Sequence, residues 1–338
     1  MRKVILVILC VMIVVHLNAQ QKPHYTQYIL NQYIVNPALT GIENYTDVKI
    51  SHRHQWVGIE GSPVTTYFTI HAPLGKSDYR TTATSFSIPG ENPRGKQYWQ
   101  DYTTASPHHG IGFQMIDDRA GPLHNSSAYV TYAYHKGLTP RTNLAAGLGL
   151  GVTRYSLDAG KLNFAVPVDP AVYSSGIINK TNPDLNAGIY LYSADYFVGV
   201  SAQQLIPAKI EFADNIVRAT NGKMTPHLFA TGGYRFLVTE DLNLTPSVMI
   251  KYLNPLPVQV EVNAKLQYRD VVWAGLSYRH KDGFAGMAGL NISSKFNIGY
   301  SYDYTTSKLN NYTNGSHEIV LGFLLGNKYD DSCPRNVW

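Results

Sequence analysis

The sequence predicts an all-β protein, a transmembrane antiparallel up-and-down β-barrel of about 14 strands. Three observations favour this fold. Segments of alternating apolar and polar residues recur along the chain, the connections between them alternate between short and long, and only 15% of the residues are charged. A soluble β-sandwich or propeller is the alternative. The apolar faces are too extensive for one small core, and no repeat of about 40 to 50 residues supports a propeller.

The clearest alternation lies at residues 258–267, VQVEVNAKLQ. One face of this strand carries Val258, Val260, Val262, Ala264 and Leu266, and the other carries Gln259, Glu261, Asn263, Lys265 and Gln267. In a membrane barrel the first face meets lipid and the second lines a polar lumen.

The first 19 residues have the composition of a secretory signal peptide. Arg2 and Lys3 form a basic start, residues 4–15 are apolar, and Ala19 can precede cleavage. An uncleaved membrane helix is the alternative, but the apolar run is shorter than the ~20 residues that span a bilayer. A lipoprotein would need its cysteine at the end of the apolar run, whereas Cys10 lies inside it.

A short segment, residues 20–44, precedes the expected barrel at 45–325. Tyr25, Tyr28, Gln32 and Tyr33 fall near helical spacing, and Asn36-Pro37 stops any helix because the residue before proline avoids the helical region. We expect a short helix or coil in the periplasm or the lumen, docked in or under the barrel. A simple lead-in to the first strand is the alternative.

Strands are expected wherever the alternation holds. In chain order they are 47–56, 64–73, 110–116, 126–135, 143–152, 185–192, 196–204, 227–236, 242–252, 258–267, 271–280, 284–292, 296–304 and 319–325. Connections after the even-numbered strands are short apart from one insert, and those after the fifth, seventh and thirteenth are long. Short turns face the periplasm in bacterial barrels, so we expect both termini there, including a tail at 326–338.

Two stretches in the first half depart from simple alternation. The insert at 74–108 is polar and rich in Gly and Pro, and it is either a periplasmic interaction element or contains two further strands near 82–88 and 97–103. The fifth strand carries Gly147, Gly149 and Gly151 on its expected inner face. Glycines there suit a crowded lumen that another element approaches closely.

The second half should carry charges inwards and tyrosines near the membrane interfaces. The interfacial tyrosines are Tyr252, Tyr268, Tyr278 and Tyr304. The inward charges are Lys251, Glu261, Lys265, Arg279, Asp303 and Glu318. Mixed signs in a narrow lumen indicate ion pairs that fill it, since buried charges need partners. A wide open pore is therefore not expected.

No residue pattern predicts catalysis, a cofactor or a metal site. His108-His109 and Asp117-Asp118 match no known metal-ligand spacing. The second pair is interpreted first as residues that form a turn. A GxSxG nucleophile motif is absent, and no dense basic run suggests nucleic acid. Cys333 is the only cysteine of the expected mature chain, which excludes a disulfide framework.

Several motifs, in the same order along the chain, resemble the PorP/SprF family of the type IX secretion system. They are QYILNQYIVNPALTG (27–41), RHQWVGIEGSPVT (53–65), DDRAGP (117–122), NPDLNAGIYLYS (182–193), SAQQL (201–205), SVMIKY (247–252) and a long C-terminal run at 277–323. The ending Cys333-Pro334-Arg335 is also similar to the family's, although residues 336–338 depart from it.

The resemblance implies a non-enzymatic outer-membrane barrel of Bacteroidetes. Such a barrel assists export or surface attachment of a client protein with a C-terminal sorting domain, for example a gliding adhesin. Its implied partners are outer-membrane lipid, that client and periplasmic type IX components, with no cofactor and no nucleic acid. A small-solute channel unconnected to secretion is the alternative. A lipid-modifying enzyme would need an inward cluster of His, Ser and acid, which the sequence does not assemble.

The candidate partner-binding or structural residues are motif residues that lipid exposure does not require. We expect Asn36, Pro37, Arg53, Gln55 and Trp56 to fix the N-terminal segment to the barrel. We expect Asn182, Pro183 and Asp184 where an outer loop re-enters a strand. We expect Tyr278, Arg279, Asp303 and Glu318 to form a network on the inner wall. The tail with Cys333, Pro334 and Arg335 is expected to contact a periplasmic partner. Fold maintenance is the alternative role for each.

Overall fold

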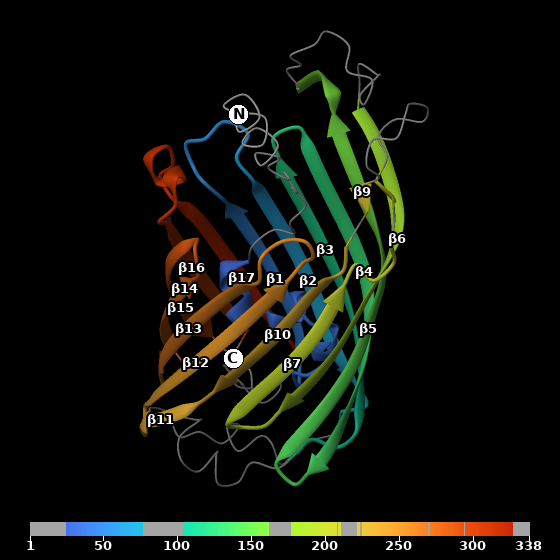
Figure 1. The fold of residues 1–338 in the computed structure, drawn as a ribbon. Coiled ribbons are helices and arrows are strands. Elements are labelled where there is room, and N and C mark those ends of the chain that lie inside the picture. Colours follow the sequence, from blue (N-terminus) through green and yellow to red (C-terminus); the bar gives the residue numbers. More distant parts are fainter. Residues whose placement is uncertain are drawn as a thin grey trace, which may run out of the picture.

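The barrel wall is one antiparallel sheet that closes on itself (Figure 1). The structure is a computed structural model that describes residues 25–76, 104–161, 177–207, 209–210, 222–223, 225–269, 271–293 and 295–326. The wall segments are β1 (Thr46–His54), β2 (Val64–Leu74), β3 (His108–Ala120), β4 (Leu123–Thr139), β5 (Thr142–Asp158), β6 (Ile177–Tyr192), β7 (Tyr196–Gln203), β10 (His227–Tyr234), β11 (Phe236–Thr239), β12 (Leu242–Tyr252), β13 (Gln259–Tyr268), β14 (Val272–Arg279), β15 (Gly283–Ser293), β16 (Phe296–Thr305) and β17 (Ser316–Leu325).

The sheet has 14 wall strands, as the sequence predicts. β1 pairs with β17 along its whole length, from Thr46 opposite Leu325 to His54 opposite His317, and this pairing closes the barrel. β10 and β11 are two pieces of one strand interrupted at Arg235, and both pair with β12, so the 15 segments of the sheet make 14 strands. Closure satisfies the backbone groups of the first and last strands, which a bilayer requires. A separate two-stranded sheet, β8 (Lys209–Ile210) and β9 (Gly222–Lys223), lies between β7 and β10 in the chain.

The connections divide the barrel into two ends. At the upper end in Figure 1, the upper mouth, lie the connections that follow β1, β3, β5, β7, β12, β14 and β16. At the opposite lower mouth lie those that follow β2, β4, β6, β11, β13 and β15, and the end of β17. Five of the six lower connections, after β4, β6, β11, β13 and β15, are short, as expected from the sequence.

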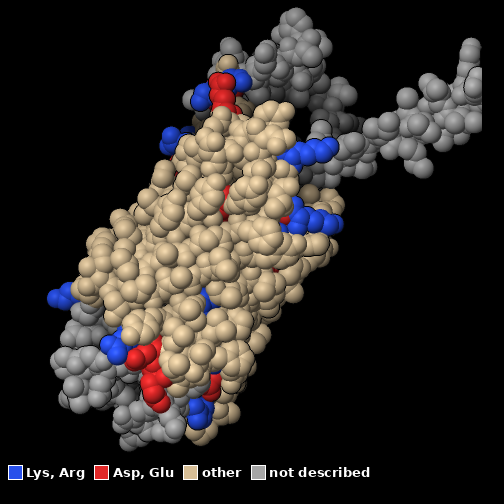
Figure 2. Space-filling view, turned by 90° about the vertical axis from the view of Figure 1, so that its left-hand side faces the viewer, with Lys and Arg blue, Asp and Glu red and all other residues tan. Residues whose placement is uncertain are grey.

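The outward side chains of the wall are mainly apolar. In β13 the alternation is the expected one: Val262 and Leu266 are exposed on the outside, whereas Glu261, Asn263 and Lys265 are buried on the inside. Across the face shown in Figure 2, Lys, Arg, Asp and Glu gather mostly at the two ends and leave the middle largely without charge. This distribution matches a wall whose middle contacts hydrocarbon and whose rims meet headgroups and water.

Four strands are at least six residues longer than the alternation predicts. β3, β4, β5 and β6 have 13, 17, 17 and 16 residues, and β3 and β4 are joined by the tight turn Gly121-Pro122. Asp117 and Asp118 are therefore strand residues of β3 and not part of a turn. The alternation misses these ends because polar side chains occupy both faces where a strand extends beyond the apolar middle of a membrane.

Several expected segments lie wholly or partly outside the described residues. These include the signal peptide at 1–19, most of the insert at 74–108 with its two candidate strands, and the tail at 327–338. β2 pairs directly with β3, from Val64 opposite Arg119 to Leu74 opposite His109, so the wall closes without strands from the insert. Within the described part of the chain, no helix has the length and apolar character needed to cross a bilayer.

The hydrophobic core lies inside the barrel. It forms around residues 25–45, hereafter the lumenal segment, which contains the short 3-10 helices η1 (Thr26–Leu30), η2 (Gln32–Ile34) and η3 (Pro37–Leu39). Tyr28, Ile34 and Leu39 are each at most 2% exposed. They pack in two apolar clusters against inward residues of the wall, among them Tyr67, Tyr190 and Trp273.

The lumenal segment crosses the lumen from one mouth towards the other. Tyr25 packs edge-on against Tyr67, three residues from the upper end of β2, and Gly41 lies against Gly110, two residues from the lower end of β3. β1 then starts at the lower mouth and β17 ends there. The first and last described residues therefore lie towards opposite mouths. The two ends of the chain, which we expect on one side, lie outside the described residues.

Candidate functional site in the barrel lumen

The conformation of the lumenal segment follows from its sequence around Asn36-Pro37. Asn36 has extended backbone angles, as a residue before proline should, and its side chain caps η3 by accepting from Ala38 N at 3.0 Å. Pro37 is the first residue of η3, where its missing N–H costs nothing. The segment therefore makes a compact series of turns that fits a narrow lumen.

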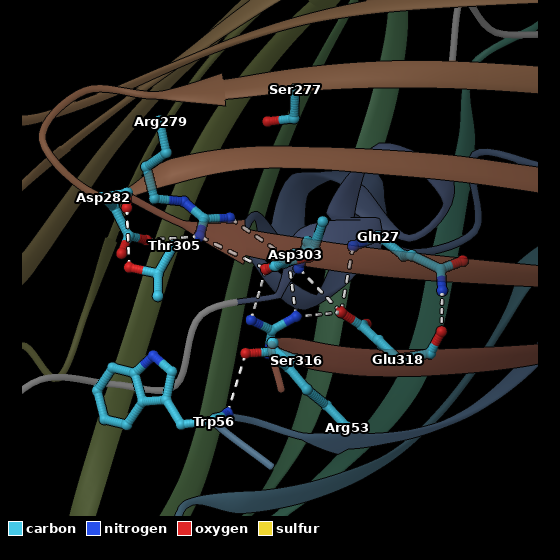
Figure 3. A network of polar contacts seen from close by, with 12 residues as sticks. Gln27, Arg53, Trp56, Ser277, Arg279, Asp282, Asp303, Thr305, Ser316 and Glu318 are labelled. Carbon is cyan, nitrogen blue, oxygen red and sulfur yellow. Dashed lines mark hydrogen bonds and ion pairs between the residues drawn. The ribbon is translucent and has the colours of Figure 1, made fainter. Parts of the chain in front are cut away.

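The upper part of the lumenal segment is held by buried charges (Figure 3). Thr26 Oγ1 donates to Asp303 Oδ2 at 2.6 Å and accepts from Arg53 Nη1 at 2.8 Å. Arg53 Nη2 lies 2.7 Å from Asp303 Oδ2, and its Nη1 lies 3.3 Å from Glu318 Oε2. Glu318 also accepts from the backbone N–H groups of Thr26 and Gln27, at 2.9 and 3.4 Å. One carboxylate thus binds both the wall and the main chain of the segment.

A second guanidinium group extends this network. Arg279 Nε donates to Glu261 Oε2 at 3.0 Å, and its Nη1 lies 2.8 Å from Asp282 Oδ2 and 3.6 Å from Asp303 Oδ2. Arg53, Arg279, Glu261, Asp303 and Glu318 are all at most 8% exposed. Charges buried this deeply are tolerated because each one has an opposite partner and further hydrogen bonds.

Along its middle the lumenal segment is recognised through its backbone carbonyl groups. Gln114 Nε2 donates to Tyr33 O at 2.7 Å, and Ser201 Oγ donates to Val35 O at 2.8 Å. Gln203 Nε2 donates to both Ile34 O and Val35 O, at 3.0 and 2.8 Å. These donors come from β3 and β7, which β4, β5 and β6 separate in the sheet. They satisfy carbonyl groups that the 3-10 turns leave free.

The lower part of the lumenal segment lies against wall glycines. A Cβ at Gly147 would lie 2.6 Å from the backbone N and Cα of Ala38, and one at Gly110 would lie 2.8 Å from Gly41 Cα. Gly188 likewise faces the Asn36 side chain and Pro37. The inward glycine that the sequence singled out at 147 thus serves a close approach, and the approaching element is the lumenal segment.

Two histidines bind the backbone at this lower end. His135 Nε2 donates to Thr40 O at 2.8 Å, and His71 Nδ1 accepts from Gly41 N at 3.1 Å. His108 stacks on His135 with ring centroids 4.5 Å apart. His109, the next residue, lies on the outer face beside Tyr132, so the His108-His109 pair cannot converge on one ion. Asp117 and Asp118 lie near the other end of β3.

The structure brings together several of the sequence-selected residues. Asn36 and Pro37 lie in the lumen, and the Asn36 Nδ2 group contacts the carbonyl oxygens of Ile189 and Val200 at 3.2 and 3.3 Å. Arg53, Arg279, Asp303 and Glu318 form the ionic network at Thr26.

Other selected residues lie elsewhere. Tyr278 is 44% exposed on the outside, where it suits an interface and not the inner-wall network, because neighbours in a strand point to opposite faces. Gln55 and Trp56 belong to the connection after β1 at the upper mouth. Their backbone N–H groups bind Pro63 O at 2.8 Å and Ser316 Oγ at 3.0 Å. Trp56 has a φ of 52°, an uncommon value for a bulky residue.

The Asn182, Pro183 and Asp184 motif lies inside a strand and not at the re-entry of a loop. β6 begins at Ile177, and Asp184 points inwards, where it accepts from the Tyr129 hydroxyl at 2.6 Å and from Thr153 at 3.2 Å. Pro183 is tolerated inside the strand because the Leu185 carbonyl accepts from Leu205 N and so points away from β5. Backbone groups two residues apart point to the same side of a strand, so the N–H that Pro183 lacks would also point away from β5. Cys333, Pro334 and Arg335 lie outside the described residues.

Sequence reasoning missed Thr26, Gln114, Ser201 and Gln203. Each wall residue among them lies on the inner face of its strand, so the alternation would have placed it in the lumen. Nothing in the alternation distinguishes a polar residue that binds another segment from one that only lines the wall.

The chain matches a known protein family over most of its length. Residues 17–323 match the family described as type IX secretion system membrane protein PorP/SprF. No curated protein sequence matches the chain.

Solved barrels are similar in outline only. The CymD monoaromatic hydrocarbon channel has a TM-score of 0.48 and 11% identity, covering 87% of this chain and 91% of that one. The toluene transporter TbuX of Ralstonia pickettii has a TM-score of 0.48 and 10% identity, with 87% and 92% covered. The translocator domain of the autotransporter NalP from Neisseria meningitidis has a TM-score of 0.41 and 12% identity, with 88% and 94% covered.

The family match spans the whole lumenal segment and nearly all of the closed wall that surrounds it. The chain is an outer-membrane β-barrel that belongs to the PorP/SprF family of type IX secretion system membrane proteins.

Proposed function

We propose that this barrel is a non-enzymatic accessory of type IX secretion that assists the export or surface attachment of one client protein with a C-terminal sorting domain. The observation that carries the proposal is the occupied lumen. The hydroxyl of Thr26 joins the lumenal segment to a buried ion pair of the wall, and the side chains of Gln114 and His135 donate hydrogen bonds to its main chain. A lumen filled in this way suits a protein that handles a partner better than one that passes small solutes steadily.

In this proposal the lower mouth faces the periplasm and the upper mouth faces the cell surface. The short turns at the lower mouth support this orientation, because short turns lie on the periplasmic side of bacterial barrels. The tail at 326–338 would then reach periplasmic components of the secretion machinery.

The upper mouth would present the surface that meets the client. There the connections at 55–63 and 306–315 are joined through Val57 N to Gly315 O at 2.8 Å and Asn314 N to Val57 O at 2.7 Å. This pairing braces two long connections from neighbouring parts of the wall and gives the mouth a defined rim.

Deletion of the gene tests the proposal. We expect one surface protein to disappear from the cell surface while other proteins with C-terminal sorting domains are exported normally, and the same protein to co-purify with the barrel in detergent. Unchanged surface proteins, together with a large steady conductance of the purified barrel in planar bilayers, would instead identify a small-solute channel.

A further inference from the structure

Side chains of the barrel wall bind the backbone of the lumenal segment, as a binding site binds a peptide ligand. Eight hydrogen bonds join wall side chains to its main chain: Glu318 accepts from Thr26 and Gln27; Gln114, Ser201 and His135 donate to Tyr33, Val35 and Thr40; Gln203 donates to Ile34 and Val35; and His71 accepts from Gly41. Main-chain groups are common to every polypeptide. A wall that binds them offers the same contacts to any segment able to adopt a similar path.

The shape of the wall also fits a polypeptide. The glycines at 110 and 147 let the backbone of the lumenal segment approach the wall more closely than a side chain would allow. These close contacts require only that the incoming residue be small. Ala38 and Gly41 are the small residues of the chain's own segment at these positions.

The upper end of the site adds a preference in charge. Arg53 and Arg279 face the carboxylates of Glu261, Asp282, Asp303 and Glu318, so two positive groups meet four negative ones. Thr26 supplies a hydroxyl donor at this point. A segment with a hydroxyl or a positively charged side chain would complement the excess of carboxylates.

The lumenal segment has a structure that allows it to dissociate from the barrel wall. It contains three short 3-10 helices and no longer regular element, and its covalent link to the wall is at its lower end, where β1 begins. Turns of this kind have poor internal hydrogen bonds, so the segment loses little of its own structure when it leaves the wall.

From these contacts we infer that the lumen is a polypeptide-binding site, filled at rest by the chain's own lumenal segment, and that a stretch of the secreted client exchanges with that segment. The existence of the site rests on the contacts alone. The identity of the incoming chain rests on the proposed function.

A reversible lock tests the exchange in the full-length barrel. The hydroxyl oxygens of Thr40 and Thr131 are 3.0 Å apart, so the pair Thr40→Cys and Thr131→Cys is placed to form a disulfide between the lumenal segment and β4. Cys333→Ser removes the remaining cysteine of the mature chain. Single Thr40→Cys and Thr131→Cys variants are the matched controls.

The binding measurement uses a fluorescent synthetic peptide with the sequence of residues 25–45. The reduced double-cysteine barrel should take up this peptide, whereas the oxidised barrel should bind it at least tenfold more weakly because its own segment cannot leave. No uptake by the reduced barrel, or equal uptake by both forms, would overturn the polypeptide site.

The second measurement follows the client protein lost on gene deletion. Cells that carry the oxidised barrel should fail to display the client, and a membrane-impermeant reductant should restore display. Normal display by a fully oxidised barrel would show that the client does not use the lumen, while the loss on deletion would leave the proposed function intact. Normal display in the deletion strain, with peptide exchange in the purified barrel, would instead refute the proposed function and keep the site.

Discussion

Replacing Arg53 with leucine tests whether the buried ionic network holds the lumenal segment in the barrel. Arg53 is 2% exposed, and it lies 2.7 Å from Asp303 and 3.3 Å from Glu318. The substitution leaves two carboxylates in a buried site without this partner. Removing one member of a buried ion pair costs about 3–5 kcal/mol, because the other charge stays buried without compensation.

The surrounding contacts place the expected cost near the lower end of that range. Asp303 keeps Arg279 at 3.6 Å, and Glu318 keeps the N–H of Thr26 at 2.9 Å. We therefore expect Arg53→Leu to lower the free energy of unfolding by about 3 kcal/mol. Urea unfolding of the barrel in lipid vesicles, followed by tryptophan fluorescence, measures this change, and Trp273 in the lumenal cluster reports directly on the segment.

The matched control is Arg269→Leu at an exposed ion pair. Arg269 lies 3.1 Å from Asp241 in the turn after β13, and the two side chains are 43% and 33% exposed. Solvent screens such a pair, so the substitution should change stability little. Equal effects of the two substitutions would refute the reasoning. The triple variant Arg53→Met, Asp303→Asn and Glu318→Gln should recover most of the loss, because it removes the charges together.

Three further predictions follow from the lumen, the outer wall and the tail. Gly147→Ala should lower the free energy of unfolding by about 1–3 kcal/mol and raise conductance in planar bilayers, because its Cβ would lie 2.6 Å from the backbone of Ala38. The control is Gly286→Ala, whose Cβ would meet no atom within 4 Å. Leu276→Arg, at an outward position 71% exposed in the middle of β14, should cost about 2–4 kcal/mol in vesicle-folding titrations, and Leu276→Ala should fold nearly normally; a tolerated arginine would contradict the lipid-facing assignment. Deletion of residues 327–338 should reduce client secretion without loss of heat-modifiable gel migration by the barrel, and normal secretion by this variant would argue against a periplasmic contact of the tail.

The alternation of residue types determined the wall. In β13 the period of two separates Val262 and Leu266 from Glu261 and Lys265, and the structure places these pairs on the outer and inner faces. This information is local, because successive side chains of a strand point to opposite faces whatever their neighbours are. The same local rule found the 14 strands, the inward charges at Arg279, Asp303 and Glu318, and the glycine face of β5.

Local periodicity did not predict the strand ends that extend beyond the apolar middle of the barrel wall. β3 continues through Asp117 and Asp118, and β6 begins at Ile177, before Asn182 and Pro183. Polar residues on both faces hide the alternation there. Backbone pairing with β4 and β5 holds these ends in the sheet even though no side-chain pattern marks them.

The tertiary structure alone decided what fills the lumen. The inward glycine at 147 predicted that some element comes close, but the element is Pro37-Ala38, more than 100 residues away in the chain. Thr26 likewise meets Asp303 and Glu318 across 277 and 292 residues. The sequence determined which side chains face inwards, because that depends on the strand alone. Which of them bind the lumenal segment depends on the path of that segment through the closed barrel, and this path exists only when all the strands have come together.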